Sequence, residues 1–380
     1  MRVFFNAIIV QVVLSAYVLW RGWNSFPKKK VVRLPYLAIF IIELIVYLLG
    51  FFFADRLDLP YIHDVAWVGT TWMVFILYMS VLLMSYDLIR FVNKKKRILP
   101  LKIDLGRSKE RLYYYSFCLI LTIGAMFWGN YRFRHPVVTY QTIDVAKSSP
   151  VNTLRIVMAA DLHAGYLIKK EIVSMYIDKI MEQKPDIILL VGDIIDYDIH
   201  SVREQRMEEV FGRLRAPYGV YGVTGNHEYI GIAGEKPFEK PEWLANEAGL
   251  TMLRDSVVLV DSAFYLVGRE DNTFEFRKEL EQLMDSVTDK SLPVILMNHQ
   301  PHDIHEADRN GIDLAFYGHT HNGQFFPNNI AVWFMYEKAY GYKKINNSHI
   351  YVTSGLGLAG PQYRIGTLSE IVVLDVNFNK

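Results

Sequence analysis

Cysteine is almost absent from this sequence, since Cys118 is the only one in 380 residues. One cysteine cannot form a disulfide within the chain, so a fold held together by internal disulfides is excluded. Cys118 also lies in an apolar segment, and it therefore says little about the cellular compartment. Internal repeats and low-complexity tracts are missing too, and nothing in the sequence points to a repeat architecture.

A net excess of charge is also missing, but the near balance conceals an asymmetry. Residues 1–131 hold 16 Lys and Arg against 7 Asp and Glu, a balance of +9. The remaining residues hold 25 and 33, a balance of −8. Nucleic-acid binding depends on Lys and Arg for its phosphate contacts, so the acidic part is a poor candidate for it. We therefore expect no nucleic-acid partner.

Long apolar segments dominate the basic part of the chain. Each reaches the roughly 17–25 residues that a helix needs to cross a bilayer. The first could be a signal peptide, but it lacks a small-residue cleavage site and three more segments follow. The segments are 3–20, 35–54, 67–92 and 112–131. We predict a four-helix transmembrane anchor at 1–131, a linker at 132–152 and a globular domain at 153–380.

The charges of the loops between these segments predict an orientation. Loops 21–34 and 93–111 are strongly basic, whereas loop 55–66 is mainly acidic. The positive-inside rule places the two basic loops in the cytoplasm, and everything after Tyr131 then lies outside. We expect a multi-pass protein of the cell membrane with an extracytoplasmic globular domain. Glu43, near the middle of the second segment, is either a functional intramembrane carboxylate or a protonated packing residue.

Apolar runs that end in Asp, Asn or His organise the rest of the chain. The run that begins at Asp186 leads into Gly192-Asp193 and then Asp196, and its length suits a parallel strand buried on both faces. Open α/β sheets place their ligand sites at the carboxyl ends of such strands. Strand-like and helical patterns alternate, which predicts a layered α/β domain. The predicted strands are 153–160, 186–191, 219–224, 293–298, 312–317, 349–354 and 369–376, and the predicted helices are 168–183, 201–215, 239–248 and 274–287.

Candidate metal ligands follow five of these strands. Asp161 and His163 are two residues apart, so on an extended segment both side chains point to the same side. Mixed nitrogen and oxygen donors suit Mn, Fe or Zn better than Mg or Ca. Seven ligands are too many for one mononuclear site and fit two divalent ions that share a carboxylate. They are Asp161, His163, Asp193, Asn226, His299, His319 and His321.

The sequence resembles the calcineurin-like metallophosphoesterase superfamily. The family pattern is D-x-H, G-D-x-x-D, G-N-H-[E/D], a lone H and G-H-x-H, and all five blocks occur here in that order. They are Asp161/His163, Gly192–Asp196, Gly225–Glu228, His299 and Gly318–His321. The resemblance covers about 150–380 and implies a four-layer αββα sandwich, with two sheets flanked by helices.

The resemblance also implies roles for the individual residues. Asp161, His163, Asp193 and His321 would bind one metal, and Asp193, Asn226, His299 and His319 the other, with Asp193 bridging. His227 would face the substrate and stabilise or protonate the leaving oxygen, while Asp196 would orient His227 or the ligand loop. Two ions about 3.5–4 Å apart can hold a hydroxide and clamp both oxygens of an in-line displacement.

Several polar residues have more than one interpretation. Tyr197 stands where many relatives have an arginine that contacts phosphate, which weakens a protein-phosphatase type of activity. Arg364 either supplies a replacement positive charge or lies on the surface. Glu228 either orients its neighbours or is solvated. The residues His302, Asp303 and His305 are interpreted as structural, and Asp271 as a turn residue.

These observations predict a membrane-anchored dimetal phosphohydrolase, more a phosphodiesterase than a monoesterase, in which a metal-bound hydroxide attacks a phosphoester or phosphoanhydride. The bilayer is the expected partner, and the substrate is expected to be a phosphoester derived from lipid or the cell envelope. One alternative is a degenerate dimetal module that binds or senses. Others are a cytoplasmic hydrolase of a nucleotide-linked lipid, and a transporter with an accessory hydrolase. The metal identity and the oligomeric state stay open.

Overall fold

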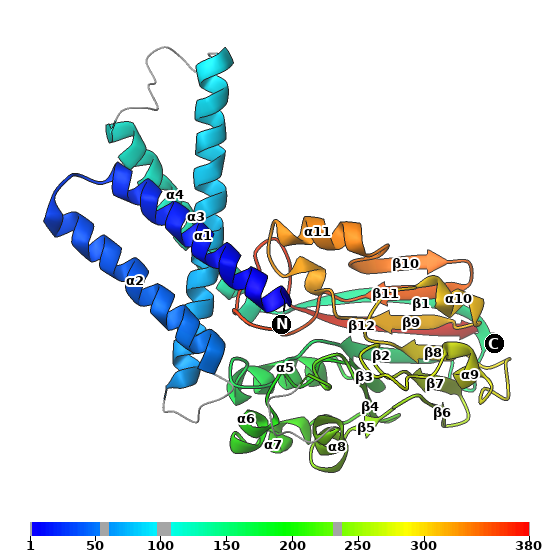
Figure 1. The fold of residues 1–380 in the computed structure, drawn as a ribbon. Coiled ribbons are helices and arrows are strands. Elements are labelled where there is room, and N and C mark those ends of the chain that lie inside the picture. Colours follow the sequence, from blue (N-terminus) through cyan, green and yellow to red (C-terminus); the bar gives the residue numbers. More distant parts are fainter. Residues whose placement is uncertain (1, 54–60, 97–107, 231–237, 380) are drawn as a thin grey trace. The chain divides into compact units, whose positions relative to one another are not determined.

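The computed structural model describes residues 2–53, 61–96, 108–230 and 238–379 (Figure 1). The chain divides into two compact units, Met1–Trp128 and Gly129–Lys380. The loops 54–60 and 97–107, on which part of the charge argument rests, lie outside the described residues.

The first unit is helical, as predicted. Helices α2, α3 and α4 contain segments long and apolar enough to cross a membrane, at Lys30–Gly50, Ile62–Lys96 and Lys109–Arg134. Helix α1 covers the first predicted span but is not among them, and the side chains of residues 1–7 lie outside the described part. The predicted count of four spans is therefore corrected to three for the described residues. The helices are α1 (Arg2–Ser25), α2 (Lys30–Phe53), α3 (Ile62–Lys96) and α4 (Ser108–Arg134).

Polar side chains inside this unit are partly paired. Arg21 Nη2 lies 3.0 Å from Asp87 Oδ1, and the Tyr17 hydroxyl donates to Asp87 Oδ2 over 2.7 Å. Glu43 is half-buried, and its shielded Oε2 accepts no hydrogen bond from any described residue. The structure therefore leaves both interpretations of Glu43 open.

The second unit contains two six-stranded sheets. The first has the order β1-β12-β2-β3-β4-β5, and the second has the order β10-β11-β9-β8-β7-β6. The strands of the first sheet are β1 (Val137–Ser148), β12 (Glu370–Asn379), β2 (Thr153–Ala159), β3 (Ile187–Val191), β4 (Val220–Val223) and β5 (Thr251–Met252). Those of the second are β10 (Gly341–Ile345), β11 (Ser348–Val352), β9 (Leu314–Tyr317), β8 (Val294–Met297), β7 (Phe264–Gly268) and β6 (Ser256–Val260).

Three apolar clusters give this unit its layers. One cluster joins inward side chains of both sheets, such as Met158 and Phe316. A second packs helices against the first sheet, and a third packs helices against the second sheet. The helices are α5 (Lys170–Glu182), α6 (Ile199–Glu204), α7 (Glu208–Phe211), α8 (Glu239–Asn246), α9 (Leu280–Met284), α10 (His305–Arg309) and α11 (Asn328–Met335). This arrangement confirms the predicted αββα sandwich (Figure 1).

The predicted linker at 132–152 is wrong. Its first residues end helix α4, and strand β1 then pairs in parallel with β12 along nearly its whole length. Buried and exposed side chains alternate over part of this strand, the pattern of a sheet with one covered face. The predicted helix 201–215 is also broken, since it forms the two short helices α6 and α7.

Candidate metal centre

The candidate ligands lie in loops that follow strands β2, β3, β4, β8 and β9. Backbone hydrogen bonds continue past the strand ends and fix the first two loops to each other. Asp161 N donates to Gly192 O, and His163 N donates to Asp193 O, both over 3.0 Å. The loop after β9 joins them because His319 N donates to both oxygens of the Asp161 carboxylate, over 3.0 and 3.1 Å.

Five of the seven candidate ligands have a left-handed backbone conformation. Their φ angles are 56° for Asp161, 51° for His163, 50° for Asp193, 69° for His319 and 47° for His321. Such a conformation costs roughly 1–3 kcal/mol for a residue other than glycine, and it persists where the surroundings enforce it. Strain of this kind concentrates at functional sites. The loops therefore hold these side chains in place at the expense of local stability.

The side chains of these loops converge into three overlapping groups. Asp161, His163 and His321 form the first, and Asp193, His299 and His319 form another. The third group joins them through His163, Asp193 and His227. Within each group the potential ligand atoms lie within 4.8 Å of one another. All predicted metal ligands except Asn226 belong to these groups.

The Asp193 carboxylate stands between the two ligand sets. Its Oδ2 lies 3.2 Å from His299 Nε2 on one side and 3.7 Å from His163 Nε2 on the other. Asp161 Oδ1 lies 3.7 Å from His321 Nε2. Both aspartates are almost fully buried. A carboxylate shared by two sets of donors is what a pair of cations requires.

The donor chemistry fits metal ions. His163 Nε2 and His321 Nε2 lie 3.2 Å apart, so two imidazole nitrogens face the same point. Asn226 Oδ1 is buried and accepts no hydrogen bond among the described residues. Buried polar atoms and carboxylates are costly unless they are hydrogen-bonded, paired or coordinated. Divalent cations would coordinate the imidazole nitrogens, the Asn226 amide oxygen and the carboxylates at once.

Asp196 links His227 to this centre. Its Oδ1 lies 2.9 Å from His227 Nδ1 and 3.3 Å from His163 Nδ1. Burial alone would raise the pKa of Asp196, but the hydrogen bonds with the two imidazoles lower it to about 2. Burial likewise opposes the charged form of His227, yet Asp193 and Asp196 raise the pKa of this imidazole. The Tyr197 ring packs edge-on against His227, with centroids 4.6 Å apart.

Glu228 and Lys240 support these loops from behind. The Glu228 carboxylate accepts hydrogen bonds from four backbone N–H groups. It therefore orients its neighbours and is not solvated. The donors, at 2.6–2.9 Å, are Asp193, Ile194, Ile195 and Gly225. The buried Lys240 ammonium donates to the carbonyls of Asp196, His227 and Ile230. Lys240 was missed because an isolated lysine in a helical pattern gives no signal of burial.

Arg364 is fully buried, so the surface interpretation of this residue is wrong. Its guanidinium donates to the carbonyls of His321, Gly355 and Gly357 over 2.8–2.9 Å. Burial lowers the pKa of Arg364 to about 10. A side chain that already binds three carbonyls holds the ligand loop in place.

The remaining polar residues have local partners. Asp271 is buried and accepts both hydrogen bonds of the Gln300 amide group, so it is more than a turn residue. His302 pairs with Gln300 Oε1 over 2.8 Å, and His305 lies 2.9 Å from the Glu337 carboxylate. Asp303 pairs with Arg309. These contacts agree with a structural role.

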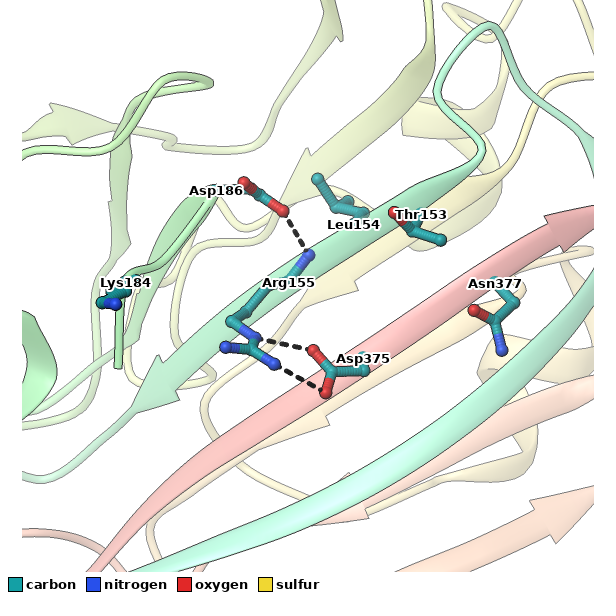
Figure 2. Close-up of a pocket in the computed structure, with 7 residues that line it drawn as sticks. All are labelled: Thr153, Leu154, Arg155, Lys184, Asp186, Asp375 and Asn377. Atoms are coloured by element: carbon teal, nitrogen blue, oxygen red, sulfur yellow. Dashed lines mark hydrogen bonds and ion pairs between the residues drawn. The ribbon is translucent and has the colours of Figure 1, made fainter. Parts of the chain in front are cut away.

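A hollow of about 370 Å³ lies away from this centre, at the amino ends of β2 and β3. In Figure 2 the Arg155 guanidinium faces the Asp375 carboxylate, and the Arg155 backbone nitrogen donates to Asp186. None of the predicted site residues lines this hollow. Its lining residues are Thr153, Leu154, Arg155, Lys184, Asp186, Asp375 and Asn377.

Residues 154–323, which contain all the loops described above, match the model of the calcineurin-like phosphoesterase family. Over this range the chain is similar to calcineurin-like phosphoesterases. The predicted resemblance is thus confirmed, and a His and Asp cluster able to hold two metal ions is part of the domain.

Several curated relatives share this domain. An uncharacterized metallophosphoesterase of Helicobacter pylori strain J99 is 31% identical over 226 residues, covering 58% of this chain and 59% of the relative. A Danio rerio transmembrane protein with a metallophosphoesterase domain is 30% identical over 236 residues, covering 58% of this chain and 52% of the relative. The chain thus spans little more than half the length of these two relatives.

One relative is similar to this chain over the helical first unit as well. A second Helicobacter pylori metallophosphoesterase, from strain 26695, is 27% identical over 379 residues, which is 97% of this chain and 96% of that protein. The three apolar helices and the transmembrane relative together indicate a membrane protein.

Proposed function

We propose that this chain is a membrane-anchored phosphohydrolase that uses two divalent metal ions to cleave a phosphodiester or phosphoanhydride. One observation carries the proposal. The buried Asp193 carboxylate lies within 3.2 Å of His299 and 3.7 Å of His163, which belong to different groups of potential ligands. A single carboxylate flanked in this way can bridge two ions.

The metal ligands divide into two sets in this proposal. Asp161, His163 and His321 hold one ion together with Asp193, which they share with the second set. Asn226, His299 and His319 complete that second set. When bound, two such ions polarise the phosphoryl group and activate a water molecule as the nucleophile. The identity of the metals, Mn, Fe or Zn, follows only from the nitrogen and oxygen donors.

His227 acts on the leaving side. Its Nδ1 lies 2.9 Å from Asp196 Oδ1, and in this proposal the other ring nitrogen, Nε2, faces the substrate. The raised pKa of His227 favours a protonated imidazole near neutral pH, and a protonated imidazole can donate to the leaving oxygen. Asp196 is therefore the positioning residue of His227.

The substrate is proposed to be a phosphoester at the membrane, derived from lipid or the cell envelope. Support comes from the three apolar helices of the same chain, which keep the domain at a bilayer. The charge of the loops supports an extracytoplasmic domain. Cleavage of an exposed loop of this domain by protease added to intact cells tests that orientation, and complete protection there contradicts it.

Hydrolysis by the purified full-length protein tests the activity. After loading with Mn, Fe or Zn, the protein is given bis(p-nitrophenyl) phosphate, p-nitrophenyl phosphate and phospholipid vesicles in parallel. We expect two ions per chain and faster cleavage of the diester than of the monoester. Well-folded protein that binds no metal would overturn the proposal, whereas metal binding without any hydrolysis would favour a binding module.

A further inference from the structure

Helix α11 exposes an unusually apolar surface. Phe334 and Met335 are 89% and 72% exposed, and Trp333 is 58% exposed. Isolated exposed apolar residues are common, but a contiguous apolar patch marks an interaction site. We call this surface the α11 patch; it consists of Phe326, Ile330, Trp333, Phe334 and Met335, which are all at least 43% exposed.

The α11 patch is attached to the metal centre. The Trp333 indole nitrogen donates to Asn322 Oδ1 over 3.0 Å, and Asn322 directly follows the candidate ligand His321. The ring of Tyr336, just after the helix, lies 6.3 Å from that of His319. Whatever binds the patch therefore lies next to the candidate ligands.

The patch also adjoins the end of the last apolar helix. Gly129, in the final turns of α4, accepts a hydrogen bond from Arg364 N over 2.9 Å, and Ile365 packs directly against it. Ile365 O in turn accepts from Phe326 N over 2.8 Å. One short segment thus joins the end of a candidate membrane span, Lys109–Arg134, to the beginning of the α11 patch. Residues 129–134, the end of this span, belong to the same compact unit as the patch.

We propose that the α11 patch inserts into the surface of the lipid bilayer in which the chain's own helices sit. Amphipathic interfacial helices bury an apolar face at the boundary between headgroups and acyl chains, and tryptophan is enriched at that depth. This insertion does not depend on the proposed hydrolysis. It keeps the loop of His321 at the level of the lipid headgroups.

Spin labels on the full-length protein in phospholipid vesicles test this insertion. The only native cysteine, Cys118, is buried, so unmodified protein measures background labelling. Phe334→Cys and Met335→Cys carry a nitroxide on the patch. Leu259→Cys is the matched control, because this exposed apolar residue lies on β6, the opposite edge of the second sheet from β10, the strand that follows α11. The measurement is the relaxation of each label by oxygen, which enters lipid, and by a water-soluble nickel complex.

We expect a ratio of oxygen to nickel relaxation several-fold higher at 334 and 335 than at 259. Equal ratios at the patch and the control would show that the patch faces water and overturn the proposal. Low relaxation by both reagents at the patch would mean that protein covers it, such as a second copy of this chain, and would also overturn it. Because no step uses catalysis, an inactive protein can still pass this test.

Discussion

The charged side chains at the amino ends of strands β2 and β3 have different partners from those at the carboxyl ends. At the amino ends, the Arg155 guanidinium lies 2.7 and 3.0 Å from the two oxygens of Asp375, and both side chains are partly exposed. At the carboxyl ends, Asp161 and Asp193 are buried, and the described groups within 4 Å that could carry positive charge are imidazoles. The first cluster is a complete ion pair, whereas the second is a set of side chains that could hold a metal ion.

This difference separates a structural ion pair from a binding site. Burial, reinforced by the nearby His299, lowers the pKa of His319 to about 4. The His319 imidazole is therefore neutral near pH 7 and offers a lone pair, as a metal ligand must. Arg155, in contrast, keeps its partner within its own sheet and has nothing to offer a ligand.

Replacing the shared carboxylate should have the largest effect. Asp193→Asn removes the negative charge proposed to bridge two ions while keeping the shape of the side chain. We expect hydrolysis to fall by more than about 10⁴-fold, beyond the roughly 10²–10⁴-fold contributed by a single general acid. Metal content, measured by mass spectrometry on folded protein, should fall as well. Full metal content with normal turnover would show that Asp193 does not bridge.

Replacing His227 should lower the rate of hydrolysis without lowering the amount of bound metal. For His227→Ala we expect turnover to fall by about 10²–10⁴-fold, the range for loss of a general acid, while the metal content stays that of the native protein. The measurements are steady-state kinetics and metal analysis of the same preparation. Loss of metal in this variant would instead assign His227 to the ligands, as its place in one ligand group allows.

Arg364 should matter for stability more than for chemistry. Arg364→Met removes a donor from three carbonyls, but His321 O still accepts from Gln324 N and Gly355 O from Glu370 N. Among the described residues, only the Gly357 carbonyl loses its donor outright, which costs roughly 1–3 kcal/mol. We therefore expect a net loss of about 2 kcal/mol, or roughly 4–8 °C in the thermal midpoint. Arg364→Lys is the control, since it keeps the charge but cannot reach all three carbonyls. An unchanged midpoint in both variants would mean that water replaces the guanidinium.

Asp196 should act through His227. Asp196→Asn removes a charge that raises the pKa of this imidazole, so the imidazole loses its proton at a lower pH. If protonated His227 is the active form, the alkaline limb of the pH–rate profile should move to lower pH. The rate at the optimum should fall by about 10–100-fold, as for other groups that orient a catalytic residue. If the variant is slower but the alkaline limb of its pH–rate profile stays at the native pH, Asp196 does not act through His227.

The sequence predicted that the candidate ligands converge at one edge of the sheets, because the rules that place residues at strand ends are local. A buried parallel strand reads as an apolar run, and the residues just after it lie at the carboxyl edge whatever the rest of the chain does. The five motif blocks therefore sufficed to place Asp161, Asp193 and His319 in neighbouring loops. The αββα layers followed from the alternation of strand and helix patterns together with the family resemblance.

Features that depend on distant partners were not predictable in the same way. Strand β1 adds to the sheet through β12, more than 220 residues later in the chain, and it lies between Pro136 and Pro150, so the segment 132–152 reads as a polar linker. The burial of Arg364 depends on the carbonyls of two separate loops. Helix α11 exposes its large apolar side chains and buries the polar Asn329, the reverse of the pattern by which a surface helix of a globular domain is recognised.

The smallest effect on stability and turnover is expected for Arg155, at the amino end of β2. Arg155→Met breaks the pair with Asp375, whose side chains are 39% and 42% exposed. Ion pairs at this exposure contribute about 0.2–1 kcal/mol, because water screens the charges and ordering two long side chains costs entropy. We expect a change in the thermal midpoint of no more than about 4 °C and unaltered turnover. Asp375→Asn and the double variant complete a cycle that isolates the pair. If either single variant loses turnover while keeping its metals, the hollow at the amino ends takes part in function, and the contrast between the two edges fails.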